Sequence, residues 1–172
     1  MNEQTQNLLT LLREVPLFSG LSLEEMERLS EEFVMVELPK GENLYQRGEE
    51  TDGLFVVSSG QIELLDEYGK PLEVLKRAET LGMEALNYVP LRQETATALT
   101  YASAFFLPNR QVRILYAEVP AFRETASVLF NSRRLASNIP MIWLEEGEKI
   151  HLMARKHPIF LLFRALVPLG AF

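Results

Sequence analysis

One stretch organises the chain: Leu81-Gly82-Met83-Glu84-Ala85-Leu86-Asn87-Tyr88-Val89-Pro90-Leu91-Arg92-Gln93-Glu94-Thr95-Ala96-Thr97. It begins with a glycine, continues with good helix formers, is interrupted by Pro90 and ends in alternating Thr and Ala. A glycine that opens a short helix leaves the first backbone N–H groups of that helix free to bind an anion, above all a phosphate. The stretch therefore predicts a short helix that can receive a phosphate, followed by a strand of small residues.

Length, composition and charge narrow the class of protein. The 172 residues suit one main domain with some length left over, and a hydrophobic fraction of 47% is enough for a packed core. The chain has no cysteine, which excludes disulfides and thiolate metal sites. The net charge of −7 divides into +3 for residues 148–172 and −10 for the rest. Because phosphate neutralisation needs clustered Lys and Arg, we expect no nucleic-acid partner.

Helical spacing and alternation predict the order of elements. Apolar spacing predicts helices over residues 4–14 and 23–32, and Ser22 and Glu25 form a capping box before the second. From residue 33 the apolar period changes to two, and turns recur about every ten residues, which favours an antiparallel sandwich or barrel. The predicted strands are residues 33–38, 43–47, 54–57, 61–65, 72–75, 95–99 and 102–107. Helices over 110–118 and 120–134 follow.

Six motifs in this order resemble the cyclic-nucleotide-binding domain family, which includes effector domains of catabolite-activator-like regulators, cyclic-nucleotide-dependent kinases and gated channels. The motifs are VPLFSGLS at residues 15–22, PKGE at 39–42, Gly48, Gly60, Gly69 and Leu107-Pro108. The resemblance covers residues 15–135. It implies a mainly β fold with flanking helices: a double-stranded β-helix, or jelly roll, with N-terminal helices and C-terminal exit helices.

In this family the quoted stretch corresponds to the phosphate-binding cassette. A glycine and the following amides receive the phosphate, an adjacent Glu binds the ribose hydroxyl, and an Arg before the small-residue strand pairs with the cyclic phosphate. The resemblance implies a site for cyclic AMP or cyclic GMP formed by Gly82, Met83, Glu84, Ala85, Arg92, Glu94, Thr95 and Ala96. Gly82 and Ala85 keep their places, but Met83 and Glu94 occupy the positions of the family's Glu and Arg.

The replacement at residue 94 reverses a charge. Opposite unit charges about 4 Å apart attract by roughly 4 kcal/mol near a protein surface, and like charges repel by as much. We therefore expect weakened or lost cyclic-nucleotide binding, with no cofactor. Two alternatives remain open: Arg92 binds a nucleotide together with the helix start, or the site takes a different small ligand. Arg92 could equally pair with Glu94. Met83 and Tyr88 are expected to be core and pocket lining.

The residue inventory argues against an enzyme, a metal site and a transcription factor. A cupin-type metal site needs several histidines inside the barrel, and His151 and His157 both lie beyond it. No Ser/His/Asp set can be assembled within the domain, and paired glutamates such as Glu49-Glu50 are typical of a solvated face. Only 37 residues follow Leu135, and they lack the turn and basic helix of a DNA-binding winged helix.

The C-terminal segment predicts a membrane partner. Residues 159–172 are apolar apart from Arg164, but they are shorter than the roughly 20 residues that a spanning helix needs. Arg155 and Lys156 stand just before them, as the positive-inside pattern requires. Residues 143–158 also resemble the segment before the first membrane helix of certain bacterial membrane proteins that carry a cyclic-nucleotide-binding-like domain. The alternative is a helix that packs on the roll.

The predicted organisation is an N-terminal helix (1–14), a cyclic-nucleotide-binding-like domain (15–135), a linker and juxtamembrane segment (136–158) and the start of a membrane helix (159–172). We expect a non-catalytic regulatory or sensory module on the cytoplasmic face of a bacterial cell membrane. A small nucleotide is its candidate ligand, and a homodimer through the exit helix is a further expectation. The alternative is a ligand-free interaction or dimerisation domain with the same fold.

Overall fold

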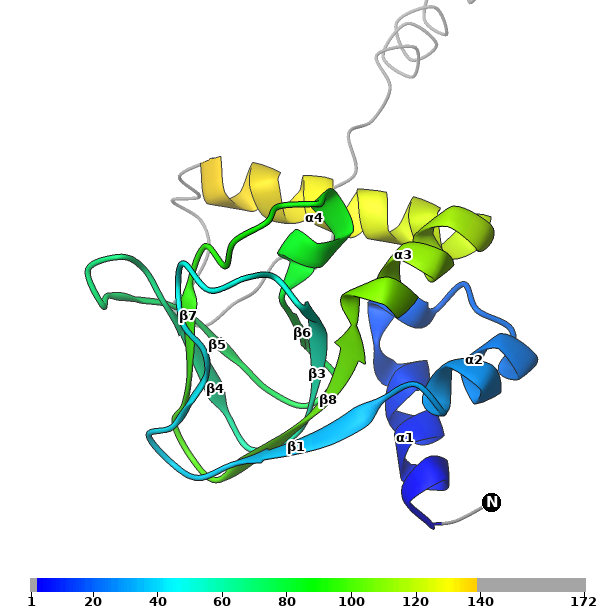
Figure 1. The fold of residues 1–172 in the computed structure, drawn as a ribbon, viewed down its shortest axis with the longest axis horizontal. Helices are drawn as coiled ribbons and strands as arrows, with labels where there is room; N and C mark the ends of the chain where they lie inside the picture. Colours follow the sequence, from blue (N-terminus) through cyan, green and yellow to red (C-terminus); the bar gives the residue numbers. More distant parts are fainter. Residues whose placement is uncertain (1–2, 139–172) are drawn as a thin grey trace, which may run out of the picture. The chain divides into compact units, whose positions relative to one another are not determined.

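The computed structural model describes residues 3–138 (Figure 1). The chain divides into two compact units, residues 1–127 and 128–172, and all strands belong to the first. The elements are α1 (Glu3–Glu14), η1 (Pro16–Phe18), α2 (Leu23–Ser30), β1 (Val34–Leu38), β2 (Asn43–Tyr45), β3 (Gly53–Ser59), β4 (Ile62–Leu65), β5 (Pro71–Leu75), β6 (Thr80–Leu81), η2 (Met83–Asn87), β7 (Thr95–Ala98), β8 (Ala102–Pro108), α3 (Asn109–Glu118) and α4 (Pro120–Asn138). The predictions for His151, His157 and residues 159–172 fall outside the described residues.

Two four-stranded antiparallel sheets form the roll. Their strand orders are β1-β8-β3-β6 and β2-β7-β4-β5. The sheets face each other across a shared apolar core that takes Phe55 and Val57 from the first sheet and Ile62 and Ala96 from the second. This arrangement confirms the predicted jelly roll with flanking helices. It also places the end of the cassette, β7, in the middle of the second sheet.

Helices cover the outer face of the first sheet, and an aromatic series joins the two layers. Phe122 of α4 stacks on Phe18 of η1, with ring centroids 5.9 Å apart. Phe18 meets Phe33 edge to face at 6.1 Å, and Phe33 meets Phe105 of β8 in the same way at 6.4 Å. Both faces of β8 are therefore buried, since Ala104 of the same strand lies in the core of the roll.

The capping box before α2 is confirmed. The Ser22 hydroxyl accepts a hydrogen bond from the Glu25 backbone N–H at 3.3 Å, and the Ser22 N–H donates to the Glu25 carboxylate at 2.7 Å. Hydrogen bonds from the Ser22 backbone and then from its hydroxyl lower the pKa of Glu25. The stabilisation from this carboxylate is therefore present above the ordinary Glu pKa and is lost as the pH falls through the folded-state pKa.

Element boundaries differ from the prediction where side chains start or end a turn. Strand β2 ends at Tyr45 rather than at residue 47, because the Gln46 N–H donates to the Glu49 carboxylate at 2.9 Å and the Glu49 N–H returns to the Gln46 carbonyl at 3.2 Å. The short strand β6 was not predicted. Within residues 3–138, no helix has the length and apolar character that a membrane span requires.

Candidate functional site

The cassette begins at a glycine that no other residue could replace without strain. Gly82 has φ +75° and caps η2, a five-residue 3-10 helix. A Cβ atom built at this position would lie 2.3 Å from Nη1 of Arg92 and 2.8 Å from the carbonyl oxygen of Gly53. Glycine is therefore required twice, for its backbone conformation and for the close approach of the arginine.

Arg92 is the buried centre of the cassette. Its side chain is 0% exposed, and Nη2 donates to Oδ1 of Asp52 at 2.5 Å and to the carbonyl oxygen of Gly53 at 2.9 Å. Nη1 lies 3.9 Å from Oε2 of Glu84, whose side chain is 14% exposed. One guanidinium is thus engaged by two carboxylates. The structure supplies Asp52 and Glu84 as its carboxylate partners, where the sequence had left a pairing with Glu94 as one of two alternatives.

Aromatic rings cover the other side of this guanidinium. Its Cζ lies 4.3 Å from the ring centroid of Tyr45 and 5.5 Å from that of Phe55. Nε and Nη1 of Arg92 are buried without a hydrogen-bond partner among the described residues. Cation–π attraction to the two rings offsets part of the cost of burying these groups.

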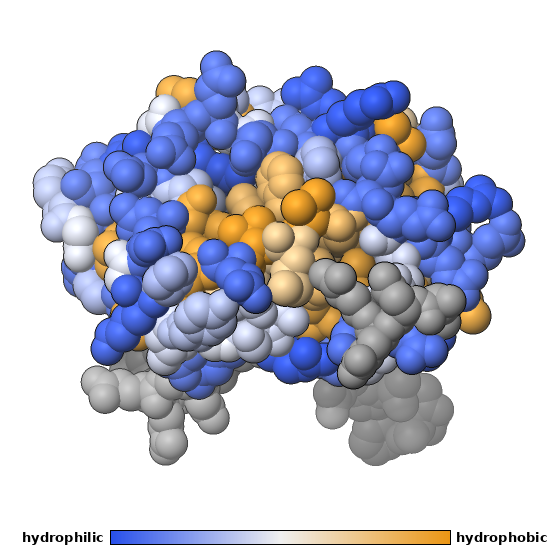
Figure 2. All heavy atoms as spheres, turned by 60° about the horizontal axis from the view of Figure 1, so that its bottom comes forward, coloured by the Kyte–Doolittle hydropathy of each residue, from blue (hydrophilic) through white to orange (hydrophobic). Residues whose placement is uncertain are grey.

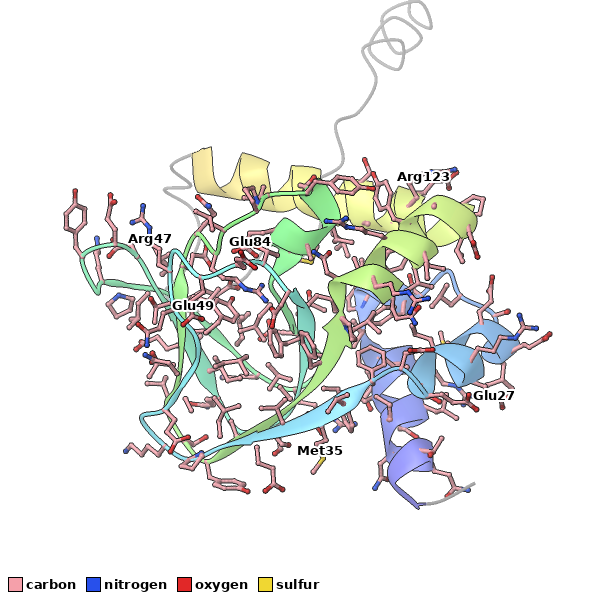
Figure 3. The ribbon with its side chains drawn as sticks, in the orientation of Figure 1. Glu27, Met35, Arg47, Glu49, Glu84 and Arg123 are labelled. Carbon is pink, nitrogen blue, oxygen red and sulfur yellow. The ribbon has the colours of Figure 1, made fainter. Side chains whose placement is uncertain are left out.

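Two loops hold the backbone of Arg92 from both directions. The Arg92 N–H donates to the Glu49 carbonyl at 2.8 Å, and the Arg92 carbonyl accepts from the Gly48 N–H at 2.9 Å. The Thr51 N–H donates to the Pro90 carbonyl at 2.8 Å. The loop between β2 and β3 therefore runs beside the loop between η2 and β7, and Figure 3 shows Glu49 and Glu84 in this part of the roll. This pairing directs the arginine inward.

The remaining predicted site residues occupy distinct places. Met83 is buried at 7% exposure, as expected for a core residue, and Ala85, which was predicted only as part of the ligand site, is buried at 3%. Glu84 stabilises the loop between η2 and β7, since its Oε1 accepts a hydrogen bond from the Gln93 N–H at 3.2 Å. Thr95 accepts from the Arg47 N–H at 3.1 Å through its hydroxyl. Ala96 is fully buried in the core of the roll and Glu94 is half-buried beside it in the chain. Gly82, Glu84 and Arg92 are thus brought together.

Three residues of the site were not identified from the sequence: Asp52, Tyr45 and Phe55. Asp52 precedes a glycine in a polar loop, a pattern that is typical of a turn, and it lies 40 positions from its partner Arg92. Tyr45 and Phe55 alternate with other residues on strands, as ordinary core residues do. Only the pairing of the two loops reveals that these side chains surround one cation.

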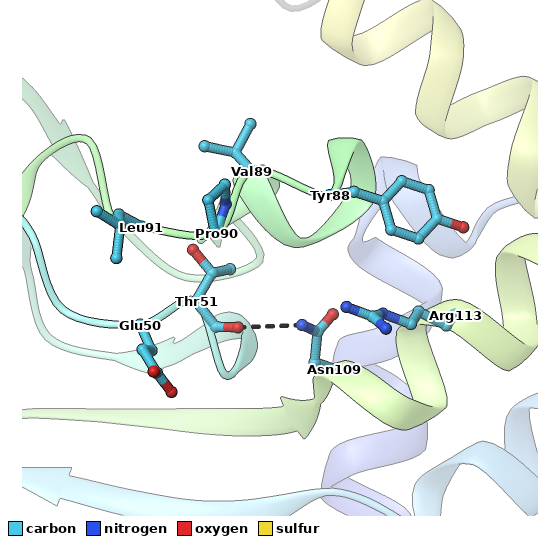
Figure 4. Close-up of a pocket in the computed structure, with 8 residues that line it drawn as sticks. All are labelled: Glu50, Thr51, Tyr88, Val89, Pro90, Leu91, Asn109 and Arg113. Carbon is cyan, nitrogen blue, oxygen red and sulfur yellow. Dashed lines mark hydrogen bonds between the residues drawn. The ribbon is translucent and has the colours of Figure 1, made fainter.

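A shallow groove of about 290 Å³ lies outside the roll, between the loop that follows η2 and the start of α3 (Figure 4). Tyr88 lines this groove and is 60% exposed. It therefore has the predicted pocket-lining role and is not a core residue. Cζ of Arg113 lies 5.4 Å from the Tyr88 ring centroid. On the floor of the groove, Nδ2 of Asn109 donates to the Thr51 carbonyl at 3.0 Å.

Acidic side chains are abundant in the roll but are not arranged around a common point. Among residues 3–138, no group of three or more His, Asp or Glu side chains is placed to hold a metal ion. The cassette itself brings together a buried cation, two nearby carboxylates and the backbone around Gly82.

Comparison with known proteins identifies the domain. Residues 35–118 match the family model described as the cyclic nucleotide-binding domain. No curated protein matches the chain.

Several solved structures share the fold. The sensor domain of the transcriptional regulator DNR from Pseudomonas aeruginosa is 22% identical with a TM-score of 0.68, and the match covers 83% of this chain and 100% of that one. The catabolite activator protein of Thermus thermophilus is 25% identical with a TM-score of 0.63, over 71% of this chain and 59% of that one. The structure described as cAMP-bound PfPKA-R is 27% identical with a TM-score of 0.64, over 80% and 51%. The chain thus matches little more than half of each of the last two proteins.

Proposed function

Because residues 35–118 belong to the cyclic nucleotide-binding domain family, we propose that the chain is a non-catalytic regulatory module whose own pocket has weakened or lost cyclic-nucleotide binding. The family comprises regulatory domains, and its structural relatives include a sensor domain and a catabolite activator protein. We infer weakened cyclic-nucleotide binding by this pocket from the charges around Arg92.

The main observation in support of this proposal is that nearby carboxylates already neutralise the charge of Arg92. Asp52 and Glu84 already engage its guanidinium, and it is covered by rings on the other side. A cyclic phosphate in the cassette would have to replace a carboxylate at Arg92 or remain near Glu84 and Glu94 without a counter-charge. Both choices cost free energy, because like charges about 4 Å apart repel by roughly 4 kcal/mol at a surface-like dielectric.

Titration calorimetry with cyclic AMP and cyclic GMP tests this proposal. We expect no saturable heat at micromolar concentrations from the natural sequence. Glu94→Arg is expected to introduce binding and to raise the affinity at least tenfold, since about 1.4 kcal/mol suffices for that factor and the substitution both removes a repulsion and adds an attraction. The gain should fall as salt concentration rises.

A matched control separates a local effect from a change in net charge. Glu42→Arg makes the same charge change at an exposed turn between β1 and β2, and it should leave the titration silent. Micromolar binding by the natural sequence would contradict the proposal directly. A Glu94→Arg variant that folds and stays silent would show that neutralised Arg92, rather than Glu94, blocks the site.

The membrane tether is a separate part of the proposal. It is supported by the apolar residues 159–172 and the basic pair Arg155 and Lys156 that precedes them. We expect the chain to float with anionic phospholipid vesicles in a density gradient. Replacing Leu161 and Leu162 together by lysine should abolish most of this flotation, since charges in the apolar segment oppose burial in lipid. Unchanged flotation of the doubly substituted chain would contradict the tether.

The alternative function is a ligand-free interaction domain. The observation that favours it is the exposure of apolar side chains on β1, where Val34 is 56% and Met35 is 41% exposed. A silent calorimetric titration together with self-association would support this alternative.

A further inference from the structure

The groove between the loop after η2 and the start of α3 contains two polar atoms that the chain leaves unsatisfied. Among the described residues, buried side-chain nitrogen or oxygen atoms without a hydrogen-bond partner belong to Thr51, Arg92 and Asn109. Arg92 is part of the cassette, whereas Thr51 and Asn109 line the groove. Apolar side chains also gather at the centre of the face that carries β1 (Figure 2), but none of these unpartnered atoms belongs to that strand. The groove is therefore the better candidate for a second ligand site.

The floor of the groove calls for a hydrogen-bond donor. Thr51 is only 8% exposed, and its unpartnered hydroxyl can both donate and accept. Nδ2 of Asn109 already donates to the Thr51 carbonyl, which leaves the unpartnered Oδ1 of Asn109 as an acceptor. Buried polar groups without partners destabilise a fold, and natural proteins tolerate them mainly at functional sites. A ligand that brings a donor would satisfy this floor.

The rim of the groove offers a cation and an aromatic ring. Arg113 is exposed and lies four positions after Asn109 on α3, so both residues are on the same face of the helix. Cζ of Arg113 is 5.4 Å from the ring centroid of Tyr88. Tyr88 has φ +56°, a strained conformation of a kind that clusters at ligand-binding sites. The guanidinium suits a carboxylate, and the exposed tyrosine ring suits a second ring.

The walls are held in place by the backbone, and the space between them is small. The Thr51 N–H donates to the Pro90 carbonyl at 2.8 Å, and Glu50 pairs with Leu91 in an isolated bridge. The groove is therefore formed in advance of a ligand, which lowers the cost of binding. Its volume of about 290 Å³ is near the lower limit of roughly 300 Å³ for small-molecule pockets. Glu50 adds a negative charge to the lining, which disfavours a second anionic group.

We propose that this groove binds a small aromatic monocarboxylate that carries a hydroxyl on its ring. The carboxylate pairs with Arg113, the ring stacks on Tyr88, and the hydroxyl donates to Oδ1 of Asn109 and accepts from Thr51. Asn109 and Arg113 are one helical turn apart, about 6 Å of rise, which a benzene ring with substituents at opposite ends can bridge. Figure 4 shows the side chains of Thr51, Asn109 and Arg113 around this space.

Two consequences follow from the position of these atoms. Oγ1 of Thr51 and Oδ1 of Asn109 are covered in this structure, so a ligand reaches them through a side-chain shift of a kind that is common on binding. The groove lies outside the roll, so the proposal stands whether or not the cassette holds a cyclic nucleotide.

Nuclear magnetic resonance of the whole ¹⁵N-labelled chain at pH 7, with 4-hydroxybenzoate as the probe, tests this site. We expect saturable shifts of the Thr51 and Arg113 backbone amides and of the Asn109 side-chain amide, with a Kd below about 1 mM. Benzoate lacks the donor and should bind about fivefold more weakly. The alcohol 4-hydroxybenzyl alcohol lacks the charge and should bind about tenfold more weakly.

Substitutions in the groove separate binding from a structural role. Arg113→Gln should weaken 4-hydroxybenzoate about tenfold, whereas Arg123→Gln makes the same charge change at an exposed arginine outside the groove and should change the affinity less than about twofold. Thr51→Val keeps the side-chain shape and should weaken binding about fivefold. It should leave the urea midpoint unchanged or higher, because the lost hydroxyl has no hydrogen-bond partner among the described residues.

Several results would overturn the proposal. One is the absence of saturable shifts up to about 10 mM probe, well above the expected Kd, and another is shifts confined to the cassette around Gly82 and Arg92. Benzoate that binds as tightly as 4-hydroxybenzoate would contradict the role of the donor. Unchanged affinity of either groove variant, or a lower urea midpoint for Thr51→Val, would show that these side chains do not form a ligand site.

Discussion

Replacement of Arg92 by alanine is expected to lower the free energy of unfolding by about 3–5 kcal/mol, the usual cost of breaking a buried ion pair from one side. The guanidinium is fully buried and donates to Asp52 and to the Gly53 carbonyl. Its loss leaves Glu84, which is 14% exposed, without its cation, and it leaves a cavity beneath Tyr45. Urea denaturation measures the effect as a lower midpoint with an unchanged slope.

Further substitutions separate charge from volume at this position. Arg92→Met keeps most of the volume and should recover part of the loss through packing. Adding Glu84→Gln removes the carboxylate left unpaired and should recover more, because a buried ion pair replaced as a unit is often tolerated. If Arg92→Ala costs less than about 1 kcal/mol, the arginine does not organise the cassette.

Replacement of Phe122 by alanine is expected to cost about 3–5 kcal/mol as well, the usual range for a buried aromatic residue. Phe122 is 0% exposed and stacks on Phe18 with ring centroids 5.9 Å apart. Its removal leaves a cavity between the start of α4 and η1 and ends the aromatic series that reaches the sheet. Chemical denaturation of the whole chain measures the change.

The control for this cavity lies two residues further along the same helix. Glu124→Ala changes an exposed position and should alter the unfolding free energy by less than about 0.5 kcal/mol. Phe122→Leu should fall between the two, since it keeps part of the buried volume. An alanine variant as stable as the natural chain would show that the start of α4 contributes little to the first unit.

Local rules predicted much of the fold from the sequence. The Ser22–Glu25 capping box predicted the start of α2, because both partners lie within one turn of chain. Alternating apolar residues and short apolar runs between turns predicted most of the strands, which are buried on one face, as in β4, or on both, as in β3. Strand β6 was missed because it has only two residues, too few for alternation to be visible.

In the candidate site, too, the sequence predicted the residues that depend on their neighbours in the chain and missed those that depend on distant contacts. Gly82 was identified because its required conformation is a property of one residue and its neighbours. Asp52 was missed as a partner of Arg92, because it lies 40 positions away and reaches the arginine through a pairing between two irregular loops. Neither loop has a sequence periodicity from which this contact could be predicted.

By itself the sequence determined the family-like order of turns, the fold class and the reversed charge at Glu94, since each depends on residue type and short-range spacing. Tertiary structure alone decided that Arg92 lies buried between Asp52, Glu84 and two aromatic rings, and that strand β1 stands at a sheet edge. The physical reason is that ion pairing and strand neighbours depend on distances in space, which chain spacing does not specify.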